Sequence, residues 1–301
     1  MISKRITATL ILVFIFSSSL YSQNDGAGNT GLSFLKLGVG ARSISMGDAF
    51  SSISDDATSV IYNPARLNFG LNNNVTVMHN ESVQDITTDF IGAKFIINKF
   101  AFGVGLLRTS ISDIEIRNIP GEPLDKFDAQ NLSLGVSIGY KLTDNLSVGI
   151  TSKFLYEKIY VDEASGFGID FGTSYTKDNL NFGFIVANLG SVNELRNVST
   201  KLPTLVRFGS GYSFNKDDFS FLISLDGFKV LDGGQFHIHS GGEIGYKDFA
   251  FLRAGYQSNY ENKSITTGAG FKYKSINIDY AFVPYSNEFG SSNTFSLGIS
   301  F

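Results

Sequence analysis

Apolar and polar residues alternate up to the last residue of this chain, and the same alternation recurs through most of its length. At the C-terminus, Phe295, Leu297, Ile299 and Phe301 fall on one side of a strand, with serine and glycine between them. Residues 132–142 repeat the pattern, with six bulky apolar residues separated by Ser, Gly and Lys. Successive side chains of a strand point to opposite faces, so each segment has one apolar face and one small or polar face. This is typical of strands that face lipid on one side.

Counting these segments predicts about fourteen antiparallel strands. They start near Leu71, Phe90, Phe100, Leu132, Leu146, Phe167, Leu180, Thr204, Phe219, Gln235, Phe249, Ser264, Ile276 and Phe295. Short turns follow the even-numbered strands. Longer and more variable connections follow the odd-numbered ones, and the longest are residues 110–128 and 190–202. An even strand number with this asymmetry predicts an all-β transmembrane barrel of the outer membrane with both termini in the periplasm. A secreted β-sandwich or propeller would not need it.

The first residues indicate export. Lys4 and Arg5 precede an almost wholly apolar stretch, residues 6–20, and the small Ser22 follows. These features predict a signal peptide over residues 1–22. Later apolar runs are shorter than the roughly 20 residues of a spanning helix, so a bilayer-spanning mature chain must close its strands into a barrel. Without Lys4 and Arg5, 22 of the 24 basic residues remain against 28 acidic ones, so no nucleic-acid partner is expected.

Residues 23–70 differ from the alternating segments, and we predict that they form a small N-terminal hatch inside a barrel of residues 71–301. A barrel of about fourteen strands lies between narrow barrels that side chains fill and wide porins with a water channel, so something should occupy part of the interior. Asp55 is the expected cap of a short helix that stops at Tyr62, because Asn63 precedes Pro64. The many inward glycines either let the hatch backbone approach the strands or let the strands bend.

The same segment carries a family resemblance. Its motifs, in order, are Phe34-Leu35-Lys36-Leu37-Gly38-Val39-Gly40-Ala41-Arg42, Met46-Gly47-Asp48-Ala49-Phe50, Asp55-Asp56-Ala57 and Tyr62-Asn63-Pro64-Ala65. This series resembles the N-terminal signature of the PorV/PorQ family, within the superfamily of long-chain fatty-acid transporters. The resemblance implies a fourteen-stranded barrel whose hatch carries an Asn-Pro-Ala motif. Two departures are Ile61-Tyr62 in place of an aromatic pair and Arg66 where a small residue is common. The candidate hatch and lumen residues are Met46, Gly47, Asp55, Asp56, Tyr62, Asn63, Pro64 and Ala65.

The resemblance also implies a function. One branch of the family belongs to type IX secretion, where it binds the C-terminal signal domain of secreted cargo and passes the cargo to a surface attachment complex. Cargo handling, with cargo and type IX components as partners, is therefore the leading hypothesis. The alternatives are passive transport of hydrophobic small molecules, such as long-chain fatty acids, and a structural protein of the outer membrane without a ligand. In each case the membrane lipid is a further partner.

An apolar group in the longest predicted loop is the candidate partner-binding site. Its members are Ile114, Ile116, Ile119, Leu124 and Phe127. Such a group is large for an exposed loop, which favours docking of a partner. The other interpretation is that these side chains fold inward over the mouth of the barrel.

Signals for an enzyme or a cofactor are weak, and we predict neither. The chain has no cysteine, which excludes disulfides, thiolate metal sites and cysteine nucleophiles. Its Gly-x-Gly pairs lack the third glycine and the strand-to-helix setting of a nucleotide site. His237 and His239 share one side of a strand and could together contact a metal ion. However, two ligands do not complete a site, so we interpret them as polar lumen residues and predict no metal.

Overall fold

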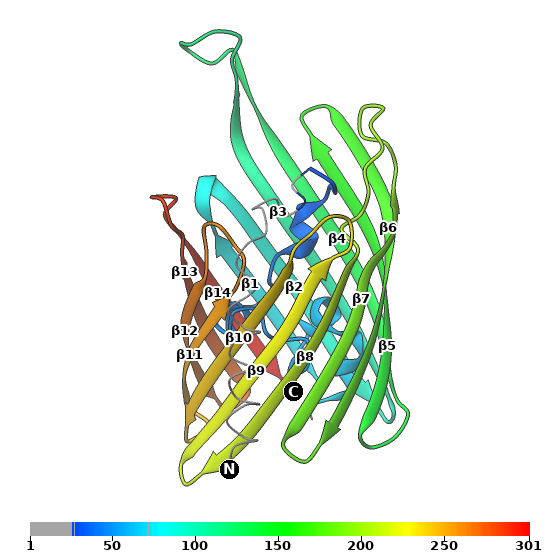
Figure 1. The fold of residues 1–301 in the computed structure, drawn as a ribbon, viewed down its shortest axis with the longest axis vertical. Coiled ribbons are helices and arrows are strands. Elements are labelled where there is room, and N and C mark those ends of the chain that lie inside the picture. The colour runs from blue at the N-terminus through cyan, green and yellow to red at the C-terminus, as the bar shows by residue number, and fades with distance from the viewer. Residues whose placement is uncertain (1–25, 27, 71–72) are drawn as a thin grey trace, which may run out of the picture.

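The structure is a computed structural model and describes residues 26, 28–70 and 73–301. Fourteen antiparallel strands form a closed barrel in which chain neighbours pair and β1 pairs with β14 (Figure 1). This confirms the predicted fold class and strand number. Closure gives every strand two neighbours, which removes the open sheet edges that lipid does not tolerate. The predicted signal peptide lies outside the described residues.

The strands are tilted and differ in length. In chain order they are β1 Asn74–Glu81, β2 Ile86–Ile97, β3 Phe100–Ile116, β4 Asp125–Lys141, β5 Leu146–Ile159, β6 Asp162–Lys177, β7 Leu180–Val192, β8 Leu205–Lys216, β9 Phe219–Val230, β10 Phe236–Tyr246, β11 Ala250–Gln257, β12 Ile265–Tyr273, β13 Ile276–Pro284 and β14 Ser291–Ser300. The helical elements are η1 Ser33–Lys36, α2 Ala41–Ser45, α3 Ser59–Tyr62, η2 Pro64–Asn68 and η3 Val83–Asp85. In the described part of the chain, no helix is long and apolar enough to span a membrane.

The connections follow the predicted asymmetry, with one correction. Each even-numbered strand leads into a short turn, and these turns lie at the end of the barrel where Asn74 pairs with Ser300; we call it the short-turn end. The predicted loop of residues 110–128 is wrong, because β3 continues to Ile116 and β4 already begins at Asp125. The two strands project as a long hairpin at the opposite, long-loop end (Figure 1). The outward residues there are polar, so the search for apolar alternation stopped too early.

Apolar residues occupy two separate places. On the outer surface, residues such as Phe102, Val136 and Phe171 are exposed, as expected for side chains that contact lipid. Inside, the main buried cluster joins the N-terminal segment to the wall; among its members, Phe50 and Tyr62 come from the segment and Phe90 comes from β2. The core therefore lies in the lumen. The wall contributes small inward residues, which leave room for this packing.

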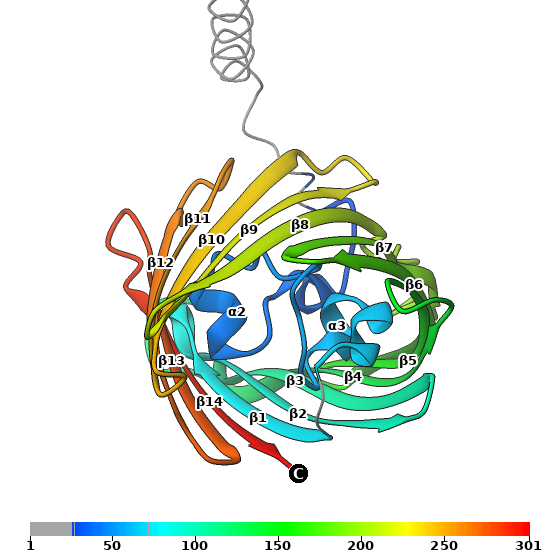
Figure 2. The same cartoon turned by 90° about the horizontal axis from the view of Figure 1, so that it is seen from below.

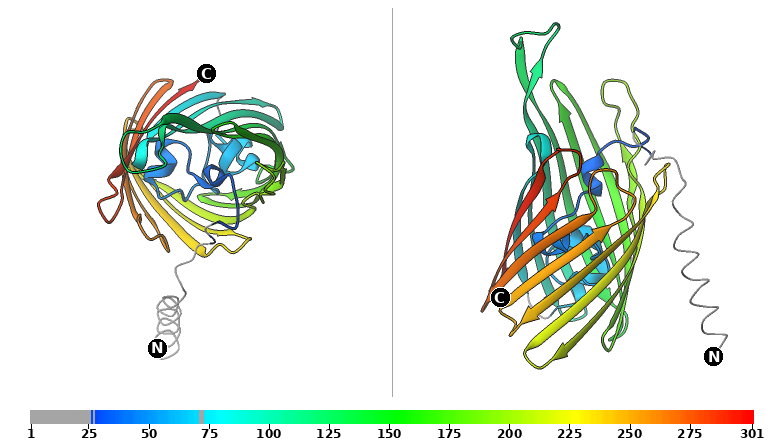
Figure 3. Two further views of the ribbon diagram at one scale, coloured as in Figure 1. Left: turned by 90° about the horizontal axis from the view of Figure 1, so that it is seen from above. Right: turned by 60° about the vertical axis from the view of Figure 1, so that its left-hand side comes forward.

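Residues 28–70, which we call the lumen segment, lie within the ring of strands (Figures 2 and 3). The segment starts at the long-loop end, where the Gly31 amide donates to the Lys201 carbonyl between β7 and β8 at 3.0 Å. It finishes near β1 at the short-turn end. The expectation that both ends lie in the periplasm is thus wrong for the N-terminal part of the described chain, since residues 28–31 lie at the opposite end from Phe301.

Candidate functional site

The Asn-Pro-Ala motif locks the lumen segment against the wall formed by β4–β6. Asn63 has an extended backbone (φ −171°), which ends α3 at Tyr62 as predicted from Pro64. Its amide nitrogen donates to the carbonyls of Ser51 and Thr173, both at 3.0 Å, and its amide oxygen accepts from the Ala65 N–H at 3.1 Å. One buried side chain therefore joins two turns of the segment to β6.

The helix before this motif is shorter than expected. It begins at Ser59, and its N-cap, Thr58, makes no side-chain cap hydrogen bond, so the predicted cap at Asp55 is wrong. The carboxylate of Asp56 instead accepts from the Thr58 N–H at 2.9 Å. Burial, reinforced by the charge of Asp55, raises the pKa of Asp56.

Glycines of the wall allow this close packing. A Cβ at Gly149 would clash with the Pro64 backbone, and one at Gly172 would clash with the Asn63 side chain. Other inward glycines that lie against the lumen segment are Gly103, Gly135, Gly139, Gly183, Gly211, Gly241, Gly255 and Gly268. Of the two explanations that the sequence left open, close approach accounts for these positions, because only a missing side chain gives the second backbone its space.

Tyr62 links both halves of the lumen segment. Its hydroxyl donates to Asp48 Oδ1 at 2.7 Å and accepts from the Val39 N–H at 3.0 Å. Burial and the neighbouring Asp48 charge raise its pKa well above the ordinary value. The other Asp48 oxygen accepts from Gln257 of β11 at 2.9 Å, and Arg207 of β8 donates to the Asp48 carbonyl at 2.8 Å. The phenol and its partners hold the segment to the β8 and β11 sides of the barrel.

Met46 and Gly47 lie where the segment touches β10–β12. Met46 is fully buried. Gly47 has φ +66°, and a side chain there would lie 2.7 Å from the Ser240 carbonyl oxygen. Its N–H donates to the Thr266 hydroxyl at 3.0 Å. The residue at position 47 thus needs both the left-handed backbone and the absence of a Cβ.

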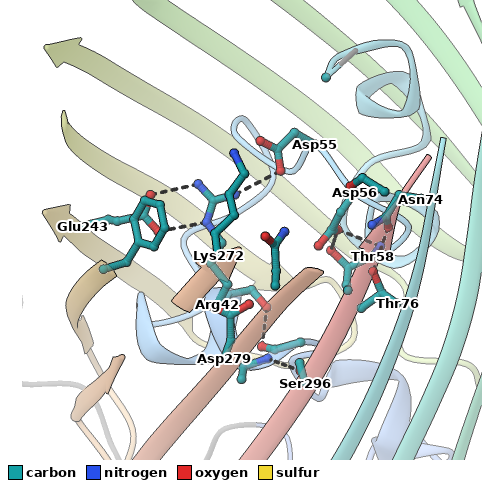
Figure 4. Close-up of a pocket in the computed structure, with 18 of the residues that line it drawn as sticks. Arg42, Asp55, Asp56, Thr58, Asn74, Thr76, Glu243, Lys272, Asp279 and Ser296 are labelled. Atoms are coloured by element: carbon teal, nitrogen blue, oxygen red, sulfur yellow. Dashed lines mark hydrogen bonds and ion pairs between the residues drawn. The ribbon is translucent and has the colours of Figure 1, made fainter. Parts of the chain in front are cut away.

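Arg42 connects the lumen segment to a charged row on the barrel wall (Figure 4). Its guanidinium donates to both carboxylate oxygens of Glu243 at 2.9 Å and to Asp55 at 3.0 Å. Glu243 also accepts from Arg253, which in turn donates to Asp279. Burial disfavours the Arg42 charge, but Glu243 and Asp55 outweigh burial and raise its pKa well above the ordinary value.

A cavity of about 500 Å³ lies beside Arg42 and extends toward the short-turn end. Asp55 and Asp56 line it from the lumen segment, as Figure 4 shows. Lys272 and Lys274, next to the β12–β13 turn, line its outer part. Most of its other lining residues carry charged, hydroxyl or amide groups. A space of this size can hold a small polar molecule or water.

The predicted lumen residues therefore divide into three contacts: the Asn63–Ala65 turn, Tyr62, and Met46–Gly47, with Asp55 and Asp56 at the cavity. The apolar group of the predicted loop is elsewhere, on the β3–β4 hairpin. Ile114 and Phe127 are direct cross-strand partners and half-buried, whereas Ile119 and Leu124 at the tip are 76% and 67% exposed. The structure thus separates this group from the lumen residues and also divides it between the stem and the tip of the hairpin.

The two histidines are buried in polar surroundings. His237 Nδ1 lies 2.9 Å from the Ser258 carbonyl oxygen, and His239 Nε2 lies 3.1 Å from the Tyr260 hydroxyl. Among the described residues there is no group of three or more His, Cys, Asp or Glu side chains placed to hold a metal ion.

Sequence reasoning missed the wall residues that hold the lumen segment, chiefly Glu243, Arg207 and Gln257. The available signal was charged or amide residues on inward strand positions, where a water-filled pore would need no such specific partners. It also missed a Gly-x-Ser-x-Gly pattern at residues 135–139. This pattern lies within β4, without a strand-to-helix turn, and the hydroxyls of Ser137 and Thr151 are hydrogen-bonded at 2.7 Å.

A closed barrel with an apolar outer surface and a filled lumen defines a β-barrel protein of the outer membrane. Residues 21–226, more than half of the chain, match the family model described as "Type IX secretion system protein PorV". The chain belongs to the PorV family, which confirms the resemblance of its N-terminal motifs. A comparison with curated proteins gave no match.

Two solved structures are similar in fold. The first is the CymD monoaromatic hydrocarbon channel, with a TM-score of 0.64 and 12% identity over 90% of this chain and 97% of that one. The second is the Pseudomonas putida toluene transporter TodX, with a TM-score of 0.62 and 15% identity over 88% and 99% of the two chains. At this identity, the likeness shows the fold and no more.

Proposed function

We propose that this protein handles secreted cargo at the long-loop end of the barrel, as a component of type IX secretion. Membership of the PorV family supports the assignment to this system. The observation that carries the cargo role is the β3–β4 hairpin, whose tip presents Ile119 and Leu124 to solvent well beyond its neighbours (Figure 1). Two large exposed side chains on a projecting hairpin favour contact with another protein.

The lumen is consistent with a role that does not depend on permeation. The segment inside the barrel is fixed by the buried Asn63, Tyr62 and Arg42 contacts on three sides. The larger cavity is lined mainly by polar groups. A hydrophobic solute would find little apolar surface there to replace water.

The test is the double variant Ile119→Ser and Leu124→Ser in the full-length protein. We expect it to assemble normally and to reduce co-purification of exported proteins with a type IX signal domain by about fivefold or more, the loss of about 1 kcal/mol or more of contact energy. The matched control is Val198→Ser, which removes an exposed apolar residue from the β7–β8 connection. Parental levels of cargo with the double variant would contradict the proposal.

Passive transport of hydrophobic small molecules is the second candidate. It is favoured by the fold shared with proteins described as a hydrocarbon channel and a toluene transporter. Deletion of the gene distinguishes the two. Cargo handling predicts altered secreted and surface proteomes with unchanged uptake of a labelled long-chain fatty acid, and transport predicts the reverse.

A further inference from the structure

The outer half of the β3–β4 hairpin has a strand edge without a strand neighbour. Pairing between β2 and β3 stops at Ile86 and Ile111, whereas pairing between β3 and β4 continues to Ile116 and Asp125. Residues 112–116 therefore pair on one side only, and within the described part of the chain no third strand covers the other side. The backbone groups along such an edge are available to a further strand.

The opposite edge of the hairpin is less open. Pairing between β4 and β5 stops at Ala129 and Ile159. Just beyond this point the ring of Phe127 packs edge-on against Tyr160, at the tip of the β5–β6 hairpin, with 5.4 Å between ring centroids. The edge of β3 is therefore the one that an additional strand can reach.

The two faces of this edge differ chemically. β4 alternates regularly, and Phe127 shares the parity of the buried Ser133 and Ser137, so it belongs to the face continuous with the barrel interior. Ile114 is its cross-strand partner and lies on that same face, whereas Glu115 lies on the outer face. Across residues 113–128 there are five acidic and two basic residues. The edge is thus apolar inside and acidic outside.

We propose that residues 112–116 dock an extended segment of a partner protein as an added β-strand, in which apolar side chains alternate with lysine or arginine. Apolar side chains of the added strand would meet Ile114 and Ile116, and its basic side chains would flank Glu115. A second copy of this hairpin is a poor occupant, because acidic edges repel each other. The inference rests on the proposed function only in taking the partner to be a secreted protein.

Cysteine trapping tests this docking directly, since the chain has no cysteine of its own. The full-length protein is purified in detergent as Glu115→Cys or, as the matched control, Lys126→Cys. These two positions are cross-strand partners on the same face and differ only in which strand carries the thiol. The probe is a nine-residue peptide of alternating Val and Lys whose central Lys is replaced by Cys. An added strand lies about 4.8 Å from β3 and about twice that from β4, beyond disulfide reach, so we expect about tenfold faster trapping at position 115.

Modified peptides separate strand addition from simple charge attraction. Two versions are N-methylated on alternate amides, each set along one edge of the peptide. Strand addition predicts that one version is trapped and the other is not, because only one edge faces β3. Equal trapping at positions 115 and 126, trapping of both methylated peptides, or equal trapping of a Glu-for-Lys peptide would each overturn the proposal. The Ile119 and Leu124 experiment measures cargo in cells, so failure of the proposed function is read separately.

Discussion

Two hydrogen bonds of 2.9 Å join the guanidinium of Arg42 in the lumen segment to the carboxylate of Glu243 on β10. The two residues are 201 positions apart in the chain. Glu243 is almost fully buried, and its second partner, Arg253, is too. The pair therefore fixes one half of the lumen segment to the wall at the head of the polar cavity.

Replacing Arg42 should loosen that half locally. In Arg42→Met, Glu243 keeps only Arg253, and Asp55 loses its 3.0 Å ion pair. We expect amide hydrogen exchange in residues 41–56 to become about tenfold faster or more, equivalent to about 1–3 kcal/mol of lost local stability. Exchange measured by mass spectrometry checks this. Lys272→Met, which breaks only the exposed pair with Asp248, is the control and should change nothing there.

The glycine contacts make a separate prediction about packing. Gly149→Ala should lower the free energy of unfolding by about 1–3 kcal/mol, because the new methyl group displaces the Pro64 backbone. Gly168→Ala is the matched control, since its Cβ would have no neighbour nearer than 3.8 Å. Urea titration of the purified barrel, followed by far-UV circular dichroism, gives both values. Equal midpoints for the two variants would show that the inward glycines serve strand bending instead.

The sequence was sufficient for the barrel because lipid imposes a two-residue period on each strand. That period predicted the strand number, the short turns after even strands and the end of α3 at Tyr62. It could not predict how far the β3–β4 hairpin extends, since outward residues beyond the lipid belt, such as Gln130 and Lys126, no longer alternate with an apolar pattern.

The lumen contacts were less predictable for a different reason. Motif residues such as Asn63 and Tyr62 were identifiable, but their wall partners lie more than a hundred positions away and are set by barrel closure. The direction of the lumen segment was also hidden. Only the contact between Gly31 and Lys201 shows that the segment starts at the long-loop end.

The raised pKa of Asp56 predicts an unusual pH dependence. A carboxyl group whose pKa is higher in the folded state than in the unfolded state destabilises the fold when it is charged, and this penalty falls as the pH drops toward the folded pKa. Asp56→Asn should therefore stabilise the lumen segment at pH 7, with a benefit that shrinks as the pH is lowered toward 4. Asp55→Asn, which removes the ion pair with Arg42, should destabilise it at pH 7. Hydrogen exchange in residues 41–62 at several pH values measures both effects.

The arrangement of the two barrel ends predicts which positions are reachable from outside the cell. Single cysteines at Ser112, Asn193 and Asn29 should react with a membrane-impermeant thiol reagent on intact cells, because all three lie at the long-loop end. A cysteine at Asp144, in the β4–β5 turn, should react only after the outer membrane is breached. Equal labelling of all four on intact cells would contradict this topology, and labelling of all but Asn29 would contradict the exit of the lumen segment at the outer end.

Removal of the lumen segment tests whether it closes the barrel. Because the segment runs the length of the lumen, an internal deletion of residues 35–67 would leave two stubs that must still be joined across it. Deleting residues 26–70 instead places the shortened N-terminal part beside β1 at the short-turn end, where Asn74 pairs with Ser300. We expect a folded barrel with raised single-channel conductance in planar bilayers, since a barrel of this strand number approaches the width of open porins. A deletion of residues 118–123, at the tip of the β3–β4 hairpin, is the control and should conduct like the parent. If the folded barrel without residues 26–70 also conducts like the parent, another part of the protein closes the lumen.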